Sequence, residues 1–121
     1  MIVAGFGFRS TVTVADLRAA LGAAGSDRPV DALATVADKA TTDAFVRFAA
    51  AENLDIIPVD ADALARQQTL TQSAVSDAAR GTGSVAEAAA LAAAGHRARL
   101  LAPRVVSADR TATCALAEGK D

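Results

Sequence analysis

The stretch that decides the fold lies at residues 80–91 and reads Arg80-Gly81-Thr82-Gly83-Ser84-Val85-Ala86-Glu87-Ala88-Ala89-Ala90-Leu91. Glycines followed by an alanine-rich segment predict a turn that leads directly into a helix, and Gly95 marks the end of that helix. The first backbone N–H groups of a helix have no partner within the helix and can bind an anion. We therefore expect an anion-binding position at this turn, formed by Gly81, Gly83 and Ser84.

A structural role also accounts for this turn. Ser84 and Glu87 are spaced as in a capping box, in which the serine bonds to the helix start and the glutamate reaches back to the cap. Capping alone and capping combined with ligand binding remain open, and a Glu87 engaged in the cap would be a poor catalytic base. Ser84 is not expected to act as a nucleophile, because no histidine or second acid forms a recognisable triad pattern with it.

Outward from this helix, short apolar runs alternate with segments of helical periodicity. The strands are predicted at residues 2–4, 30–36, 54–59, 98–102 and 111–117. Helix starts are recognised by a Thr or Asp ahead of the first periodic residue. They are predicted at Thr13, with Asp16 facing it, at Thr41 or Thr42, at Asp60 and, as a single turn, over residues 73–79.

Strands that alternate with helices of about ten residues predict an α/β fold. We expect a single domain over residues 1–121, built as a three-layer α/β/α sandwich with a mainly parallel or mixed sheet. The last two strands are expected to pair antiparallel across the polar turn at residues 107–110. In such folds ligands bind at the carboxyl ends of the strands.

A second glycine-containing segment, Gly5-Phe6-Gly7-Phe8-Arg9, follows the first predicted strand. We expect a turn here that brings a cation and two aromatic rings to the carboxyl end of the strand. Because Phe6 and Phe8 alternate along an extended segment, one ring should face the core and the other a ligand pocket. The third glycine of a dinucleotide-binding fingerprint is missing, with Ser10 in its place, so no nicotinamide or flavin cofactor is expected.

The next predicted strand also ends in polar residues, from Thr35 to Lys39. As a functional pair, Lys39 would contact a carboxylate of the ligand and Asp38 would orient Lys39 or a loop N–H group. The alternative is that Asp38 and Lys39 simply pair with their neighbours in the fold.

Composition limits the function classes. The chain has 121 residues, of which 52% are hydrophobic, a net charge of −2 and one cysteine, Cys114. These values predict one domain without disulfides, in a reducing, cytoplasmic compartment. No run approaches the roughly 20 apolar residues of a membrane span, and the first residues lack the positive region of a signal peptide. One histidine, His96, and one cysteine provide no metal-ligand cluster, so no metal is expected.

The last third of the chain is locally basic. The stretch at residues 80–110 contains Arg80, Arg97, Arg99, Arg104 and Arg110, against the acids Glu87 and Asp109. Such a region suits a phosphate or carboxylate partner. A nucleic-acid surface is weakly supported, because the chain has no lysine-rich run and neither Trp nor Tyr.

Five segments occur together in an order that identifies a family. They are Gly5-Phe6-Gly7-Phe8-Arg9, Ala34-Thr35-Val36-Ala37-Asp38-Lys39-Ala40, Ser73, the stretch from Gly81 to Leu91, and Thr111-Ala112-Thr113. In this order they resemble the C-terminal domain of the cobalt-precorrin-5A hydrolase CbiG, a domain that also occurs alone. The resemblance covers residues 5–117. It implies a stand-alone member of this family, acting in the aerobic, late-cobalt-insertion route of corrin ring biosynthesis.

The sequence departs from the family pattern at two places. Ser10 and Thr11 stand where a basic residue and a glycine are common, and Pro103-Arg104 replaces a common lysine, whose cation would then come from Arg104. The hydrolase activity of the fused proteins is credited to their other regions. The resemblance therefore does not carry an enzyme activity over to this chain.

The ligand implied by the resemblance is an anionic corrin or precorrin intermediate, bound by a carrier or accessory factor without a cofactor of its own. A corrin carries acetate and propionate groups around a flat ring, so its site needs guanidinium and backbone N–H donors and an apolar face. The expected ligand-binding residues are Gly5, Phe6, Gly7, Phe8, Arg9, Thr35, Asp38, Lys39, Ser73, Gly81, Gly83 and Ser84.

Two further hypotheses remain open. One is an enzyme that assists ring contraction or hydrolysis of a precorrin, as a cobalt-precorrin-5A hydrolase does, with Asp38 or Glu87 as acid or base. The other is a subunit that docks onto a precorrin methyltransferase through its basic last third. Neither nucleic acid nor a membrane is an expected partner, and a homodimer remains open.

Overall fold

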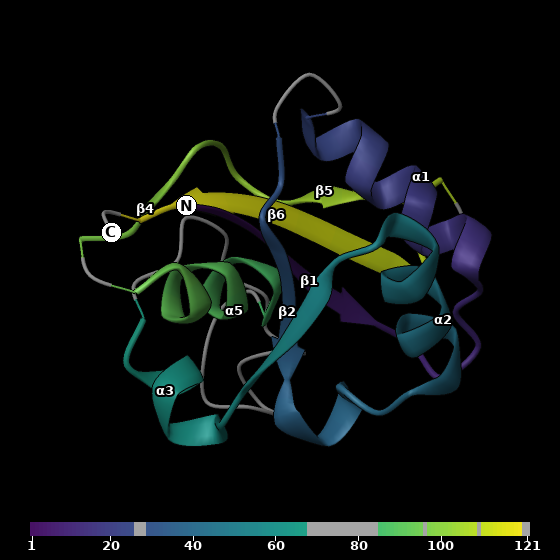
Figure 1. Cartoon of the computed structure of the whole chain (residues 1–121), viewed down its shortest axis with the longest axis horizontal. Coiled ribbons are helices and arrows are strands. Elements are labelled where there is room, and N and C mark those ends of the chain that lie inside the picture. Colours follow the sequence, from purple (N-terminus) through teal and green to yellow (C-terminus); the bar gives the residue numbers. More distant parts are fainter. Residues whose placement is uncertain (26–28, 68–84, 96, 109, 120–121) are drawn as a thin grey trace.

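The computed structural model describes residues 1–25, 29–67, 85–95, 97–108 and 110–119. Across these ranges the core element is a six-stranded mixed sheet in the order β3-β2-β1-β6-β4, with β5 also paired to β6 (Figure 1). Its strands are β1 (Ile2–Phe8), β2 (Ala32–Val36), β3 (Asp55–Val59), β4 (Arg99–Leu100), β5 (Val105–Val106) and β6 (Ala112–Glu118). The first three strands are parallel, and β6 runs antiparallel to β1, β4 and β5.

Helices cover both faces of this sheet, which confirms the predicted α/β/α sandwich. The helices are α1 (Val14–Gly25), α2 (Asp43–Glu52), α3 (Ala61–Ala65) and α5 (Val85–Ala94), with a 3₁₀ turn, η1 (Ala37–Lys39), after β2. In Figure 1, α1 and α2 lie on one side of the sheet, and α3 and α5 lie on the other. In the described ranges, none of the helices has both the length and the apolar character needed to cross a bilayer.

The predicted helix boundaries follow local hydrogen bonds. The Thr13 N–H donates to Asp16 Oδ2 at 3.0 Å and the Asp16 N–H donates to Thr13 Oγ1 at 3.1 Å, a reciprocal cap that starts α1. Asp60 Oδ1 accepts the Ala63 N–H at 2.7 Å and starts α3. Helix α5 ends at Gly95, whose φ of +82° is the left-handed conformation that favours glycine. These three predictions are confirmed.

Two buried cores lie on the two faces of the sheet. The core under α1 and α2 contains Phe6, Phe8, Phe45 and Phe48. The Phe6 ring meets the Phe45 and Phe48 rings edge-on, with ring centroids 5.6 and 5.5 Å apart. The core under α3 and α5 is built mainly of small side chains, the alanines of α5 together with Val3 and Leu64. Helix α5 therefore lies closer to the sheet than a helix with large side chains would allow.

The turn predicted at residues 5–9 is wrong, because β1 continues through both glycines to Phe8. A Cβ atom at Gly5 would lie 2.1 Å from the Ala86 carbonyl oxygen and 2.5 Å from the Ala90 nitrogen. Gly5 is thus required by the approach of the α5 backbone to β1. The glycine that suggested a turn is a packing residue in a central strand.

The closing strands also differ from the prediction. The segment expected as one strand at 98–102 contributes only Arg99 and Leu100 to the sheet. These residues pair antiparallel with β6, as expected, but β5 forms the hairpin with β6 across the turn. Ser107 Oγ accepts the Ala112 N–H at 3.1 Å within the hairpin turn. The helical turn predicted at residues 73–79 lies outside the described residues.

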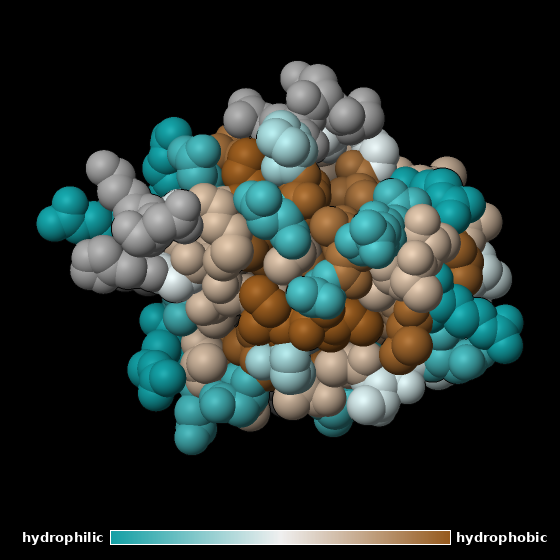
Figure 2. Space-filling model, viewed as in Figure 1, coloured by the Kyte–Doolittle hydropathy of each residue, from teal (hydrophilic) through white to brown (hydrophobic). Residues whose placement is uncertain are grey.

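Strand β3 forms one edge of the sheet, where Pro58 is tolerated because proline lacks the N–H group that an inner strand needs for pairing. Ile56 packs against the core under α1 and α2, and Ile57 packs against the core under α3 and α5. Both remain half-buried. Figure 2 shows apolar residues at the centre of this face of the molecule, where Figure 1 places β3 and its neighbour β2.

Candidate functional site

The carboxyl ends of the parallel strands meet the first turn of α5 at one edge of the sheet. The Cβ position of Gly7, near the end of β1, lies 3.5 Å from Val85 Cβ and 3.7 Å from the Ala86 nitrogen. The turn η1 follows β2 directly at this edge. Because β6 is antiparallel to β1, its first residues come to the same edge, with Thr113 opposite Gly7. Segments about 100 residues apart in the chain therefore form the candidate site.

Arg9 continues β1 at this edge. Its N–H donates to the Thr111 carbonyl at 2.9 Å, and its own carbonyl accepts the Val12 N–H at 3.0 Å. The side chain is exposed. The backbone of Arg9 is therefore held by the fold, while its guanidinium faces solvent at the strand end where the sequence predicts a ligand contact.

The two aromatic residues of β1 correct one expectation. Phe6 is 0% exposed and Phe8 is 8% exposed, and both belong to the core under α1 and α2. Residues two apart along a strand point to the same face, so the expected division into one core ring and one ligand-facing ring is wrong. In this structure the two rings supply core packing and do not line an open apolar pocket.

Thr35 is also fully buried. Its hydroxyl donates to the Phe6 carbonyl oxygen at 2.8 Å and joins β2 to β1. The hydroxyl thus has a structural partner, and a ligand contact by Thr35 stays a prediction.

Lys39 anchors η1 to the end of β1. Its ammonium group donates a hydrogen bond to the Phe8 carbonyl oxygen and lies 5.3 Å from the centroid of the Phe8 ring, at cation–π distance. The neighbouring Asp38 is exposed. The structure supports the alternative in which Lys39 pairs with its neighbours, and its contact with a ligand carboxylate stays a prediction.

Glu87 lies in the first turn of α5 and is 0% exposed. Its Oε2 accepts the Arg104 N–H at 2.8 Å, which joins the β4–β5 connection to α5. A carboxyl group with no exposed surface is poorly placed to act on a substrate as acid or base. Glu87 therefore has a structural role in this fold, and the backbone of Arg104 is positioned by it.

Four of the expected site residues, Ser73, Gly81, Gly83 and Ser84, lie outside the described residues, as does His96. Because Ser84 is one of these residues, the cap expected between Ser84 and Glu87 also lies outside the described residues. Within the described ranges, no three His, Cys, Asp or Glu residues gather as they would around a metal ion. Burial raises the pKa of the Cys114 thiol, so this cysteine remains protonated in the core.

Thr113 was not among the expected ligand-binding residues, although the structure brings it into the candidate site. Its hydroxyl donates to the Gly7 carbonyl oxygen at 3.2 Å, across 106 positions of sequence. Thr111 and Thr113 alternate with the buried Ala112 and Cys114 in the sequence. This alternation of polar and apolar residues is the signal by which a polar face of β6 is recognisable.

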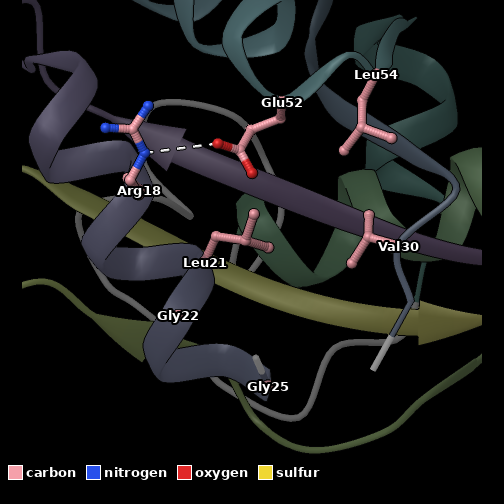
Figure 3. Close-up of a pocket in the computed structure, with 7 residues that line it drawn as sticks. All are labelled: Arg18, Leu21, Gly22, Gly25, Val30, Glu52 and Leu54. Atoms are coloured by element: carbon pink, nitrogen blue, oxygen red, sulfur yellow. Dashed lines mark ion pairs between the residues drawn. The ribbon is translucent and has the colours of Figure 1, made fainter. Parts of the chain in front are cut away.

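A pocket of about 350 Å³ lies at the opposite edge of the sheet. Its lining consists of Arg18, Leu21, Gly22, Gly25, Val30, Glu52 and Leu54 (Figure 3). Leu21, Val30 and Leu54 point toward a common space beside the ion pair of Arg18 Nε and Glu52 Oε2, which are 3.5 Å apart. Val30 and Leu54 precede β2 and β3, so the pocket lies at the amino ends of these strands, away from the predicted site.

Comparisons with known proteins agree on one family. The model of the family described as "Cobalamin synthesis G C-terminus" matches residues 2–117. The structure superposes on the 1.7 Å crystal structure of CobE, a protein from the cobalamin (vitamin B12) biosynthetic pathway, with a TM-score of 0.85. The two are 34% identical, over 97% of this chain and 89% of that chain. No curated protein matches the chain.

A second crystal structure, the cobalamin biosynthesis protein chiG from Agrobacterium tumefaciens str. C58, is also 34% identical. It matches with a TM-score of 0.72 over 100% of both chains. A cobalamin biosynthesis protein G homolog from Sulfolobus solfataricus matches with a TM-score of 0.74, over 98% of this chain and 37% of that chain. At 18% identity, this third likeness supports the fold alone.

Proposed function

The chain belongs to the cobalamin synthesis G C-terminus family, and on this basis we propose that it binds an anionic corrin or precorrin intermediate as a carrier or accessory factor. Membership of the family assigns the protein to cobalamin biosynthesis. The observation that carries the finer proposal is the exposed Arg9 at the carboxyl end of β1, held in place by its backbone bond to Thr111. The proposal includes a cytoplasmic location, which a single unpaired cysteine favours.

The chemistry of the proposed ligand suits this edge of the sheet. Corrin intermediates present several carboxylates, and a guanidinium group binds a carboxylate through two parallel hydrogen bonds. Arg9 supplies such a group, and Lys39 holds a second cation at the end of the adjacent strand. The first turn of α5 adds a region of positive potential that favours a bound anion.

The size of the pocket beside Arg18 argues against that pocket as the corrin site. At about 350 Å³ it is near the lower end of the volumes that hold small ligands, and it lies beside an ion pair that already neutralises its cation. A tetrapyrrole macrocycle with its side chains needs a larger or more open surface.

The enzyme and docking-subunit hypotheses have less support. Of the two candidate acids, Glu87 is buried and engaged with the Arg104 backbone, which leaves Asp38. The basic last third is partly neutralised, because Arg99 Nη2 lies 3.2 Å from Glu118 Oε1. A titration with a corrin distinguishes both of these hypotheses from the carrier hypothesis.

A titration of the purified protein with hydrogenobyrinic acid, a metal-free corrin, tests the proposal. The visible spectrum of the pigment reports binding, since the protein does not absorb there. A saturable spectral shift without chemical change of the pigment is the expected result for a carrier. Conversion of a precorrin would favour the enzyme. Absence of any shift, together with co-elution with a pathway methyltransferase, would favour the docking subunit.

A further inference from the structure

We propose that the pocket between the C-terminal ends of α1 and α2 binds a small organic cation, an ammonium group on an apolar body about the size of one benzene ring. The pocket has a volume of about 350 Å³ and lies at the amino ends of β2 and β3 (Figure 3). The proposed corrin site lies at the carboxyl ends of the same strands. This second site therefore goes beyond the proposed function and does not depend on it.

Three aliphatic side chains give the pocket an apolar wall. Leu21, Val30 and Leu54 point toward one common space in Figure 3, and all three pack against the core under α1 and α2 while remaining partly exposed. Gly22 adds no side chain to the lining, and a Cβ atom there would have nothing within 4 Å. An apolar cavity of about 150 Å³ is enough to hold benzene. The volume of this pocket therefore suffices for one ring and a short polar group.

Glu52 supplies the anionic group of the pocket. It is the last residue of α2, and its side chain is 29% exposed. Its partner among the described residues is Arg18, whose Nε lies 3.5 Å from Glu52 Oε2, longer than an ordinary N–H···O hydrogen bond. In Figure 3 the other carboxylate oxygen points toward Leu21 and the common space. An ammonium group in the pocket can therefore donate to a carboxylate that is partly shielded from water.

Two helix ends add to the negative potential of the pocket. Helix α1 contributes Gly22 and Gly25 of its last turn to the lining, and α2 contributes Glu52. The C-terminal end of a helix carries a partial negative charge that favours a nearby cation. Both helices are described from end to end, and neither has a basic residue in its last turn. The potential of the two helix ends therefore favours a cationic ligand over an anionic one.

Arg18 lies at the rim of the pocket and competes with such a ligand. Its side chain is 58% exposed. An ion pair with a mostly exposed partner contributes little to stability, so the guanidinium can move into solvent when a ligand ammonium takes its place at Glu52. The competition fixes the sign of one effect. A cation should bind more tightly when Arg18 is replaced by a neutral side chain, whereas an anion should bind less tightly.

The test uses three probes that share one ring and differ in charge. They are benzylamine, which is protonated at neutral pH, benzyl alcohol and benzoate. NMR titration of the isotope-labelled protein follows the backbone amide signals of Gly22 and Leu54 in the lining. Benzylamine is expected to give saturable shifts of these signals and to bind about tenfold more tightly than benzyl alcohol. Benzoate is expected to leave the signals unshifted.

Variants separate the charge of the pocket from its volume. Glu52→Gln should weaken benzylamine binding about tenfold and leave benzyl alcohol unchanged. Arg18→Met keeps an apolar stem and should strengthen benzylamine binding about threefold. Gly22→Leu puts a side chain into the open volume and should abolish binding of both probes. The matched control is Asp43→Asn, which removes a carboxylate paired with Arg47 at the start of α2 and should change neither affinity.

The outcomes that would overturn the proposal are distinct. One is the absence of saturable shifts with benzylamine. A second is benzoate binding that is lost in Arg18→Met, which would make this an anion site. A third is an equal affinity of Glu52→Gln and the wild type for benzylamine. Thermal unfolding confirms that each variant is folded, and if Gly22→Leu is not, Glu52→Gln and Arg18→Met decide. The corrin titration uses another ligand, so its result leaves this proposal unaffected.

Discussion

Arg9 combines a backbone fixed by the β1–β6 ladder with an exposed side chain. Replacing Arg9 by Ala should weaken corrin binding by at least about 1 kcal/mol, because a charge-assisted contact is lost. The unfolding temperature should hardly change, since the Arg9 side chain is exposed. Spectral titration and thermal melts measure the two effects.

Arg47→Ala is the matched control for this variant. Arg47 is an exposed arginine of α2, paired with Asp43 at 3.0 Å on the surface of the helix. Its removal should leave the affinity for the corrin unchanged. If Arg9→Ala binds as tightly as Arg47→Ala, Arg9 is not part of the site.

Gly5 is predicted to be important for the stability of the protein. Gly5→Ala places a methyl group 2.1 Å from the Ala86 carbonyl oxygen, and neither backbone can move without displacing α5. We expect a loss of about 3 kcal/mol or more, the upper range for overpacking. Gly22→Ala lies in α1 with open space around it, and should stabilise the protein by about 1 kcal/mol. Urea denaturation measures both, and similar midpoints would contradict the close packing of α5.

At the scale of the element, α1 depends on its N-terminal cap. Thr13 and Asp16 exchange hydrogen bonds between side chain and backbone at the start of the helix. Thr13→Ala should lower the free energy of unfolding by about 1 kcal/mol, whereas Thr13→Ser should keep most of it. Equal denaturation midpoints for Thr13→Ala and the wild type would show that the cap does not stabilise α1.

Helix α5 is joined to the β4–β5 connection by Glu87. The buried Glu87 carboxylate accepts the N–H of the half-buried Arg104 at 2.8 Å. Glu87→Ala removes this acceptor and leaves a cavity, so we expect a loss of about 2 kcal/mol or more. Glu87→Gln keeps an acceptor oxygen of the same reach and should lose less. The order of the two midpoints in urea checks the role, and a reversed order would refute it.

At the scale of the whole molecule, Cys114 reports on global unfolding. It lies in the middle of β6, fully buried, and burial raises the pKa of its thiol. The thiolate is the reactive form, so a thiol reagent should react slowly with the native protein. Because Cys114 faces the core under α1 and α2, we expect reactivity and loss of circular dichroism to show the same urea midpoint. Fast labelling below that midpoint would indicate that this core opens locally.

The sequence predicted the layers of the fold because the helices and strands that form them are marked by residues close together in the chain. Thr13, Asp60 and Gly95 mark helix ends by bonds and dihedral angles that involve only nearby residues. Alternation of strands and helices then favours a sheet covered on both faces. The limits of β1 and the strand that forms the last hairpin were missed, since they depend on pairing between distant segments.

The sequence predicted which strand ends carry the candidate site, but not which face of the sheet each side chain lies on. Arg9 and Lys39 lie at the expected carboxyl edge. The sequence did not show that the Lys39 ammonium bonds to the Phe8 carbonyl, or that Phe6 and Phe8 share one buried face. The Lys39 bond joins β1 to a segment 31 positions away along the chain. The shared face of Phe6 and Phe8 follows from strand alternation, and it was missed because residues 5–9 were expected to form a turn.

By itself, the sequence determined the α/β class, the helix starts and the resemblance to the family, all of which rest on local patterns or on the order of segments. Only the tertiary structure decided that Gly5 makes room for α5 and that Thr113 lies opposite Gly7. The physical reason is that the ladder register and the approach of a helix are set by packing between distant residues, such as the paired Ile2 and Glu118 at opposite ends of the chain. No local propensity of either segment specifies that packing.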